Sequence, residues 1–186
     1  MSTVSTPRLL TAEEFALLPS PEDGSQQELV SGVVVTMPPP SNYHALCCNE
    51  IVFRLNVHIR PLKLGSVAIN DGGVILSRDP DIVRGPDIAY WSRERMPEPP
   101  RKGYPDIAPD LVVEVMSPSD IFTQLLRKVQ QYLRAGTREV WIAVPEDRSI
   151  AVCRSGQEQI ILSNGETLTG GDVLPGFSCL VAELFP

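Results

Sequence analysis

Residues 109–145 constrain the fold of this chain more than any other segment. Residues 111–116 (LVVEVM) are an apolar run with the length and composition of a buried strand, and residues 139–144 (EVWIAV) are a second. The stretch between them has the periodicity of an amphipathic helix. This order predicts a strand, a helix and a second strand that lies parallel to the first.

The limits of this helix are predicted from its capping residues. Ser117 suits the N-cap, Pro118 the first helical position, and Asp120 the residue that closes a capping box. The helix is expected to end near Ala135, because Gly136 readily takes the left-handed conformation that often follows a helix.

Two charged residues stand out in this unit. Glu114 lies in the middle of the first apolar run, where an unpaired carboxylate would be costly to bury. Lys128 lies on the edge of the apolar stripe of the helix, at helical spacing from Ile121, Leu125 and Tyr132. A lysine at such a position often only extends its alkyl chain over an apolar surface. The carboxylate on the preceding strand favours a functional role instead.

The length and charge of the chain limit its class. A chain of 186 residues suits a single domain, residues 1–186. Its net charge of -7 argues against tight nucleic-acid binding through general phosphate attraction, so any such contact must be local. No apolar stretch reaches the roughly 18 residues of a membrane helix, and the N-terminus lacks a signal-peptide pattern. We therefore expect a cytoplasmic protein with no membrane contact.

The cysteines and histidines do not form a recognisable metal motif. Cys47 and Cys48 are adjacent, and they fall in the same predicted helix as His44 and His58. A zinc site usually shows a C-x-x-C pair or a matching distant pair of ligands, and the chain has neither. The pattern therefore favours packing roles for these residues and reduced thiols for all four cysteines.

Local signals predict the other elements. They are a helix over residues 11–18, a hairpin of residues 27–30 and 33–37, a helix from Ser41 or Asn42 to about Ile59, a second hairpin within residues 65–76, a polar turn over residues 77–85, and strands at residues 88–91, 150–153 and 159–162. The strand at residues 88–91 is led by Pro86 and Asp87.

Three further residues are candidates for a site, each with an ordinary structural alternative. Glu28 is either a functional carboxylate or a solvent-facing charge on an edge strand. His44 either points toward a site from the start of its helix or is a core or surface histidine. Asp87 is either a ligand at the start of a strand or a turn residue. The densest basic run, Arg93, Arg95, Arg101 and Lys102, is either a contact for a phosphate backbone or a solvated loop.

Asp87 and Glu114 converge if their strands are neighbours. Two carboxylates form a hard, oxygen-only site that suits Mg²⁺ or Mn²⁺ better than zinc, and the carbonyl of Val115 is a further candidate ligand. Such an ion lowers the pKa of a bound water and offsets charge on a phosphate, while the ammonium of Lys128 positions the nucleophile or stabilises the transition state. The chemistry indicated is metal-assisted phosphodiester hydrolysis.

These residues resemble a known pattern. Pro86-Asp87, Glu114 in an apolar strand and Lys128 resemble the PD-(D/E)XK superfamily of restriction-endonuclease-like nucleases, and the chain more narrowly resembles the Uma-type endonucleases of bacteria. The narrower likeness is carried by Glu28 with Gly32, the proline-rich turn before His44, Pro86-Asp87-Ile88, residues 111–120, Lys128 with Tyr132, Ala135-Gly136, Glu139 with Trp141, and Leu174-Pro175-Gly176.

The resemblance implies an α/β fold with a restriction-endonuclease-like mixed central β-sheet flanked by helices, to which this chain adds β-hairpins. It also implies a divalent metal at the aspartate and glutamate, and often a homodimer. One position departs from the superfamily pattern, because Met116 stands where a lysine usually follows the glutamate by two residues. The resemblance then implies that Lys128 on the helix takes the place of that lysine.

The sequence thus leads to one main hypothesis and one alternative. The main hypothesis is a divalent-metal-dependent DNA endonuclease in which Asp87, Glu114 and the Val115 carbonyl bind Mg²⁺ or Mn²⁺, Lys128 acts on the attacking water or the transition state, and Glu28 assists. The alternative keeps the nuclease fold without catalysis, as an interaction or nucleic-acid-binding module. The expected partner is DNA. The protein itself is expected to form a homodimer.

Overall fold

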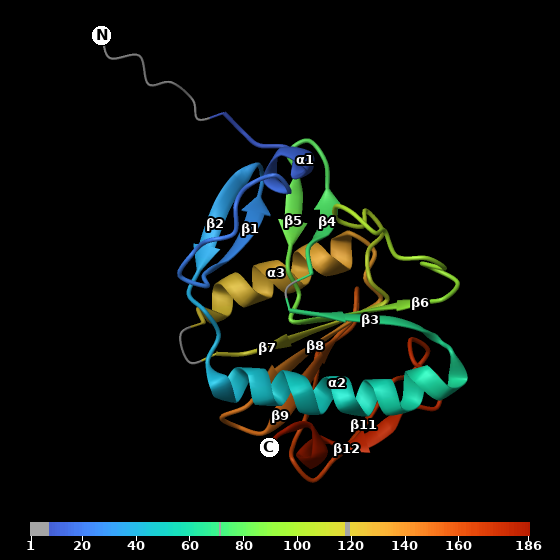
Figure 1. The fold of residues 1–186 in the computed structure, drawn as a ribbon. Helices are drawn as coiled ribbons and strands as arrows, with labels where there is room; N and C mark the ends of the chain where they lie inside the picture. Colours follow the sequence, from blue (N-terminus) through green and yellow to red (C-terminus); the bar gives the residue numbers. More distant parts are fainter. Residues whose placement is uncertain (1–7, 71, 118–119) are drawn as a thin grey trace.

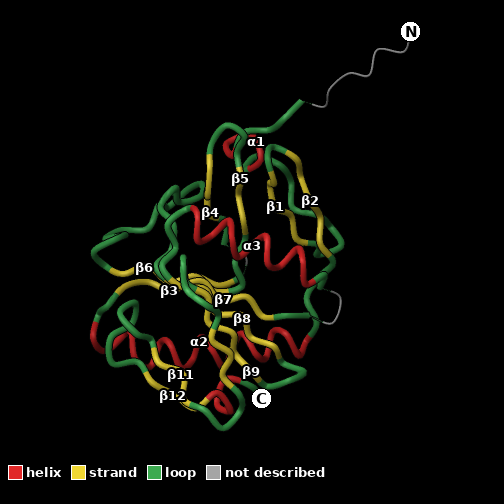
Figure 2. The backbone as a smooth tube through the Cα atoms, turned by 180° about the vertical axis from the view of Figure 1, so that it is seen from behind, coloured by secondary structure: helices red, strands yellow, loops and turns green. Residues whose placement is uncertain are grey.

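The computed structural model describes residues 8–70, 72–117 and 120–186. Within these ranges the chain forms one four-stranded, one six-stranded and one two-stranded sheet (Figures 1 and 2). The four-stranded sheet has the order β2-β1-β5-β4, with β1 Gln26–Val30, β2 Val33–Met37, β4 Val74–Ser77 and β5 Ile82–Arg84. No helix in the described part of the chain is both long enough and apolar enough to span a membrane.

The six-stranded sheet is mixed and has the order β10-β9-β8-β7-β6-β3. Its strands are β3 Gly65–Ile69, β6 Ile88–Ser92, β7 Leu111–Val115, β8 Glu139–Val144, β9 Ser149–Cys153 and β10 Ile160–Leu162. The C-terminal part adds the two-stranded sheet of β11 Thr167–Thr169 and β12 Ser178–Leu180, followed by a 3-10 helix, η1 Val181–Leu184.

The predicted strand-helix-strand unit is confirmed. β7 and β8 are parallel, with Val113 opposite Trp141, and α3 (Phe122–Arg134) connects them. Gly136 follows the helix with a φ of 101°, in the left-handed region predicted for it. Every residue of β7 is buried, as expected for a strand covered on both faces.

The predicted start of this helix is wrong. α3 begins at Phe122, and its N-cap, Ile121, makes no side-chain capping bond. The side chain of Asp120 accepts a hydrogen bond from the backbone N–H of Ser117 at 2.8 Å, and the backbone N–H of Asp120 donates to the carbonyl of Ser117. These two residues therefore close a local turn before the helix. Pro118 lies outside the described residues.

Two helices cover opposite faces of the six-stranded sheet. α2 (Asn42–Leu62) packs its buried residues, among them Ile51 and Leu55, against a core that includes Val113 and Trp141. α3 packs on the other face, and Figure 1 shows it between this sheet and the four-stranded sheet. Side chains that α3 directs away from the six-stranded sheet are therefore close to β1 and β5.

The two predicted hairpins have different outcomes. The hairpin of β1 and β2 is confirmed, and both turn residues have positive φ, 52° at Ser31 and 75° at Gly32. The hairpin predicted within residues 65–76 is wrong, because β3 pairs with β6 while β4 pairs with β5. The pairing of β4 with β5 was not predicted, because β5 lies in the segment predicted to be a polar turn.

The capping residues of the other helices were predicted correctly. α1 (Ala12–Phe15) begins after Thr11 with the predicted capping box, although it is shorter than residues 11–18. α2 is capped by Ser41, whose side chain accepts a hydrogen bond from the backbone N–H of His44. The helix continues through Pro61 to Leu62, a little beyond its predicted end.

Candidate metal and catalytic site

The two strands that carry Asp87 and Glu114 are neighbours in the six-stranded sheet. β6 and β7 are antiparallel, with Ile88 opposite Val113, so Asp87 lies at the end of β6 beside Glu114. The backbone N–H of Val115 donates a hydrogen bond to Asp87 Oδ2 at 2.6 Å. The register therefore places two acidic residues, 27 positions apart in the sequence, side by side on adjacent strands.

Glu114 points toward α3. In β7, Val112 packs on the α3 face while Val113 packs on the α2 face, so alternation places Glu114 on the α3 face. There Lys128 Nζ donates to Glu114 Oε2 at 2.9 Å, and the hydroxyl of Tyr132 donates to Oε1 at 2.9 Å. Lys128 and Tyr132 lie at helical spacing on one face of α3, so both side chains reach Glu114 from that face. These two donors explain how a carboxylate is accommodated in an apolar run.

Glu28 belongs to the same buried group. Its side chain is 2% exposed and lies 3.0 Å from Lys128 Nζ, measured to Oε1. It also accepts hydrogen bonds from Arg84 Nη1 and from the backbone N–H of Gly85 at 2.9 Å. The solvent-facing alternative for Glu28 is wrong, because β1 is an interior strand between β2 and β5.

Sequence analysis missed Arg84 and Gly85. Arg84 ends β5, in the segment predicted as a polar turn, and it bonds both Glu28 and Gln131 of α3. The carbonyl of Gly85 accepts a hydrogen bond from Lys128 Nζ at 2.9 Å. The alternating isoleucine, valine and arginine of β5 were the only local signal, and three residues are too few for periodicity to predict a strand.

Burial and the charges of neighbouring side chains determine which residues of this buried cluster are protonated. Burial raises the pKa of Glu114 to about 8; the ammonium of Lys128 opposes this effect, and the negative charges of Asp87 and Glu28 add to it. Burial alone would lower the pKa of Lys128, but Glu114, Glu28 and Asp87 together raise it above the ordinary value. Lys128 is therefore a permanent cation near neutral pH and cannot serve as a general base.

The other members of the group have defined protonation as well. Although burial opposes it, the charges of Lys128 and Arg84 lower the pKa of Glu28 below its ordinary value. Burial and the nearby carboxylates raise the pKa of the Tyr132 phenol well above its ordinary value. Glu28 is therefore ionised and paired with Lys128. Tyr132 keeps its proton, and its hydroxyl donates a hydrogen bond to Glu114.

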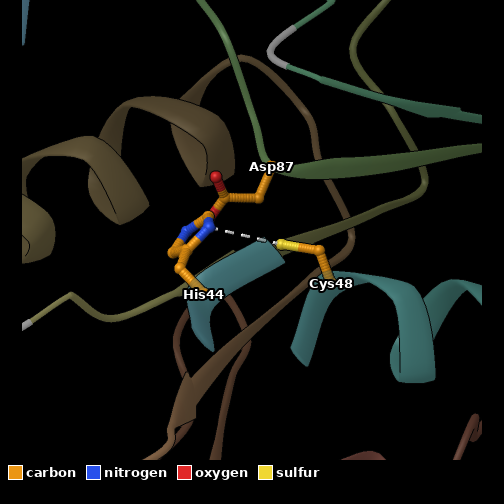
Figure 3. A group of neighbouring side chains, drawn as sticks. All are labelled: His44, Cys48 and Asp87. Carbon is orange, nitrogen blue, oxygen red and sulfur yellow. Dashed lines mark hydrogen bonds and ion pairs between the residues drawn. The ribbon is translucent and has the colours of Figure 1, made fainter. Parts of the chain in front are cut away.

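Asp87 faces a different set of side chains. Its Oδ2 lies 3.3 Å from His44 Nε2, and the side chains of both residues are 11% exposed. His44 Nδ1 lies 3.7 Å from the sulfur of Cys48, one helical turn further along α2 (Figure 3). His44 therefore lies at the candidate site, in contact with one of the predicted ligands, and not in the apolar core.

A pocket of about 630 Å³ opens beside these residues. His44, Cys48 and Asp87 line it from the start of α2 and the end of β6, together with Gln27 of β1 and Tyr104. The buried residues Glu28, Glu114 and Lys128 are not part of its lining. Asp87 therefore lies between the open pocket and the buried charged group.

The donor set suits a hard divalent ion only in part. Asp87 and Glu114 supply carboxylate oxygens from adjacent strand ends, as Mg²⁺ or Mn²⁺ prefers, with waters and phosphate to complete an octahedron. Both oxygens of Glu114 accept hydrogen bonds from α3, and Val115 directs its N–H toward Asp87. An ion between the two carboxylates would therefore have to exchange with one of these bonds.

The basic loop starts away from Asp87, and one of its residues reaches the pocket. It begins after Ser92, at the end of β6 opposite to Asp87. Within it, Arg95 donates to Asp110 at 3.1 Å and to the carbonyl of Gly136 at 2.9 Å, so its charge is used to hold the loop against the sheet. From this loop, Tyr104 is the residue that lines the pocket.

The mixed sheet, the helix on each of its faces, and the Asp and Glu on adjacent strands with a Lys on α3 define a protein with a restriction-endonuclease-like fold. The sequence matches the family model of Uma2, described as "Putative restriction endonuclease", over residues 12–182, and the chain belongs to this family. No curated protein matches the chain.

A solved structure has a similar fold. It is a crystal structure of a protein from Anabaena variabilis, described as a "putative nuclease belonging to DUF820", which matches with a TM-score of 0.81 and 22% sequence identity. The match covers 95% of this chain and 97% of that chain. The two proteins therefore share their fold over nearly all of both chains.

Proposed function

We propose that this protein is a divalent-metal-dependent endonuclease that hydrolyses phosphodiester bonds in DNA. The observation that supports this most directly is the register of β6 and β7, which places Asp87 beside Glu114, with the ammonium of Lys128 2.9 Å from Glu114. Membership of a family described as "Putative restriction endonuclease" supports nucleic acid as the substrate.

Each residue has a proposed role. Asp87, Glu114 and the carbonyl oxygen of Val115 hold Mg²⁺ or Mn²⁺, which when bound supplies an activated water and positive charge for the scissile phosphate. Lys128 stabilises the negative charge that develops in the transition state and holds Glu114 in place. Glu28 fixes Lys128 through a contact of 3.0 Å and is a positioning residue.

A plasmid-nicking assay tests this function. Purified protein is incubated with supercoiled plasmid and Mg²⁺ or Mn²⁺, alongside Asp87→Ala and Asp87→Asn. We expect both variants to lose at least about tenfold in nicking rate, because each removes a carboxylate ligand and with it more than about 1.4 kcal/mol of transition-state stabilisation. Asp147→Asn, at an exposed turn position, is the control and should nick like the wild type. Equal nicking by all four proteins would indicate a contaminant and contradict the proposal.

The alternative is a nuclease-fold module that binds a partner or nucleic acid without cleaving it. It is favoured by the hydrogen bonds on both oxygens of Glu114 and by Met116 in place of the usual lysine. Electrophoretic mobility shifts with the same plasmid distinguish the two. Binding that needs no metal, with no nicking under any metal, would support the module.

We also propose a homodimer that forms through the outer face of α2. Four large apolar side chains on this face are 45% to 58% exposed: Tyr43, Leu46, Phe53 and Val57. Their spacing of three, seven and four residues is that of a helix-packing seam, and α2 runs for 21 residues, so a second copy of the same helix fits it.

Light scattering after size-exclusion chromatography measures the dimer. We expect the wild type to elute with twice the chain mass and Phe53→Glu to elute as a monomer, because two charges would face each other at the seam. Ile161→Glu, an equally exposed apolar residue on β10, should leave the dimer intact. A monomeric wild type would refute the proposed interface.

Two further properties complete the proposal. Residues 1–186 form a single domain, as supported by the ion pairs of Glu28 in the four-stranded sheet with Lys128 of α3 on the six-stranded sheet. The protein acts in the cytoplasm, where its four cysteines, none of which is in a disulfide in the described part of the chain, remain reduced.

A further inference from the structure

His44, Cys48 and Asp87 offer a second set of metal ligands beside the site described above. We propose that these three side chains form a site for a borderline or soft divalent cation, of which Zn²⁺ is the type case. We further propose that its occupation excludes Mg²⁺ from Asp87. The second part rests on the proposed nuclease function, whereas the first does not.

The geometry supports a three-ligand site. One donor atom from each of the three residues lies within 4.8 Å of the other two. Among the described residues, this is the group of three or more potential metal ligands that lie this close together. With bonds of about 2.0–2.3 Å at tetrahedral angles, zinc ligands lie about 3.4–3.6 Å apart. The 3.3 Å contact between His44 Nε2 and Asp87 has about this spacing, whereas the 3.7 Å contact with Cys48 is made by the other ring nitrogen, Nδ1, and is not a spacing between two ligands of the same ion.

The fold fixes the positions of the three ligands. His44 and Cys48 are four residues apart on α2, which places them on the same face of the helix. Asp87 approaches from the end of β6, and the Val115 N–H holds its carboxylate at 2.6 Å. The two His44 contacts use different ring nitrogens, so a cation would take one nitrogen after a small rotation of the ring.

The chemistry of the ligands selects the metal. Mg²⁺ binds oxygen donors and gains little from imidazole or thiol, whereas Zn²⁺ binds nitrogen, sulfur and carboxylate oxygen together. All three residues line the pocket of about 630 Å³, so the fourth coordination position faces an accessible space. Three protein ligands with one open position is the arrangement of zinc sites that exchange water or a substrate.

Because Asp87 belongs to both ligand sets, the two metals compete. A cation held by His44 and Cys48 would draw Asp87 away from Glu114, whose carboxylate accepts hydrogen bonds from Lys128 and Tyr132. Micromolar Zn²⁺ should therefore inhibit Mg²⁺-dependent cleavage, and the thiol of Cys48 should be needed for that inhibition.

Cobalt titration tests the site without any nuclease assay. Metal-free protein is titrated with Co²⁺ as a spectroscopic substitute for Zn²⁺, and near-ultraviolet thiolate-to-cobalt charge-transfer absorption is measured. We expect one Co²⁺ per chain with this absorption in the wild type. In Cys48→Ala the absorption should disappear and the affinity should fall at least about tenfold. Cys47→Ala is the matched control, because the adjacent thiol is fully buried in the core beneath α2. It should bind Co²⁺ like the wild type, and equal behaviour of the two variants would overturn the site.

The nuclease assay tests the competition. With Mg²⁺ alone, Cys48→Ala should nick plasmid like the wild type. With added Zn²⁺, the wild type and Cys47→Ala should lose activity at a zinc concentration at least about tenfold lower than Cys48→Ala. Equal zinc sensitivity of all three proteins would overturn the competition. A wild type that binds Co²⁺ as expected but nicks no DNA would refute the proposed nuclease function and leave the metal site supported.

Discussion

Glu114→Gln is expected to abolish metal-dependent DNA cleavage and at the same time to stabilise the fold above pH 7. Loss of a carboxylate ligand removes the charge that holds the ion, so the nicking rate should fall on the order of a hundredfold or more, equivalent to about 3 kcal/mol. The amide keeps the shape of the side chain. Its oxygen still accepts from Lys128, while its NH2 faces Tyr132 and donates to the phenol oxygen, so the direction of that hydrogen bond is reversed. Lys128 retains Glu28 at 3.0 Å and the Gly85 carbonyl at 2.9 Å.

The gain in stability follows from the pKa of Glu114. The native pKa is about 8 and the ordinary pKa of a glutamate is 4.5, so between these values the native state binds more protons than the unfolded state. The free energy of unfolding of the wild type therefore falls as pH rises through this window. Glutamine removes the titration, so the variant should gain little at pH 5 and on the order of a few kcal/mol above pH 8.

Thermal unfolding at pH 5 and pH 8.5 measures this difference. Glu139→Gln is the matched control, because Glu139 is another buried glutamate on the neighbouring strand β8, 2.6 Å from Arg154. That substitution breaks a part-buried ion pair and should lower the melting temperature at both pH values. If Glu114→Gln were destabilised at pH 8.5, or cleaved DNA at the wild-type rate, Glu114 would not have the role proposed for it.

A residue that is needed for activity but costs stability is what a catalytic site predicts and a purely structural module does not. Buried carboxylates with a structural role are usually balanced by cations, as Glu28 is by Arg84 and Lys128. Around Lys128 three carboxylates compete for one ammonium, and Glu114 is the one whose ionisation is disfavoured. A bound divalent cation would supply the missing positive charge.

The sequence predicted those parts of the site that lie on strongly patterned elements. Glu114 and Lys128 were identified because a charge inside an apolar run, or on the edge of an apolar stripe, breaks a pattern that is otherwise complete. Asp87 was identified because it leads a strand of four apolar residues.

Residues on weakly patterned elements were missed. Arg84 lies on the three-residue strand β5, whose pairing with β1 and β4 is set by contacts distant in sequence. The set of His44, Cys48 and Asp87 was also missed, because two ligands come from one helix and the third from a strand 39 positions later. A spacing motif cannot show a ligand set that only the tertiary fold completes.

Lys128→Met is expected to destabilise the protein by about 3 kcal/mol near neutral pH, a larger effect than that of any exposed lysine. Methionine fills the space of the alkyl chain, but the Gly85 carbonyl and Glu114 Oε2 lose their donor. Removal of one partner from a buried ion pair costs about 3–5 kcal/mol. The lower value is expected because Glu28 keeps Arg84 and the Gly85 N–H.

Urea unfolding at two pH values identifies the source of this loss. Without Lys128 nothing opposes the effect of burial on Glu114, so its pKa should rise further and the loss of stability should grow between pH 5 and pH 8.5. Lys128→Met combined with Glu114→Gln should recover part of the loss, because the unpaired carboxylate is gone. Lys102→Met, in the exposed loop, should change stability by less than about 0.5 kcal/mol. If Lys128→Met unfolded like Lys102→Met, the ammonium would contribute no net stability. Its burial between two carboxylates would then have to be explained by catalysis alone.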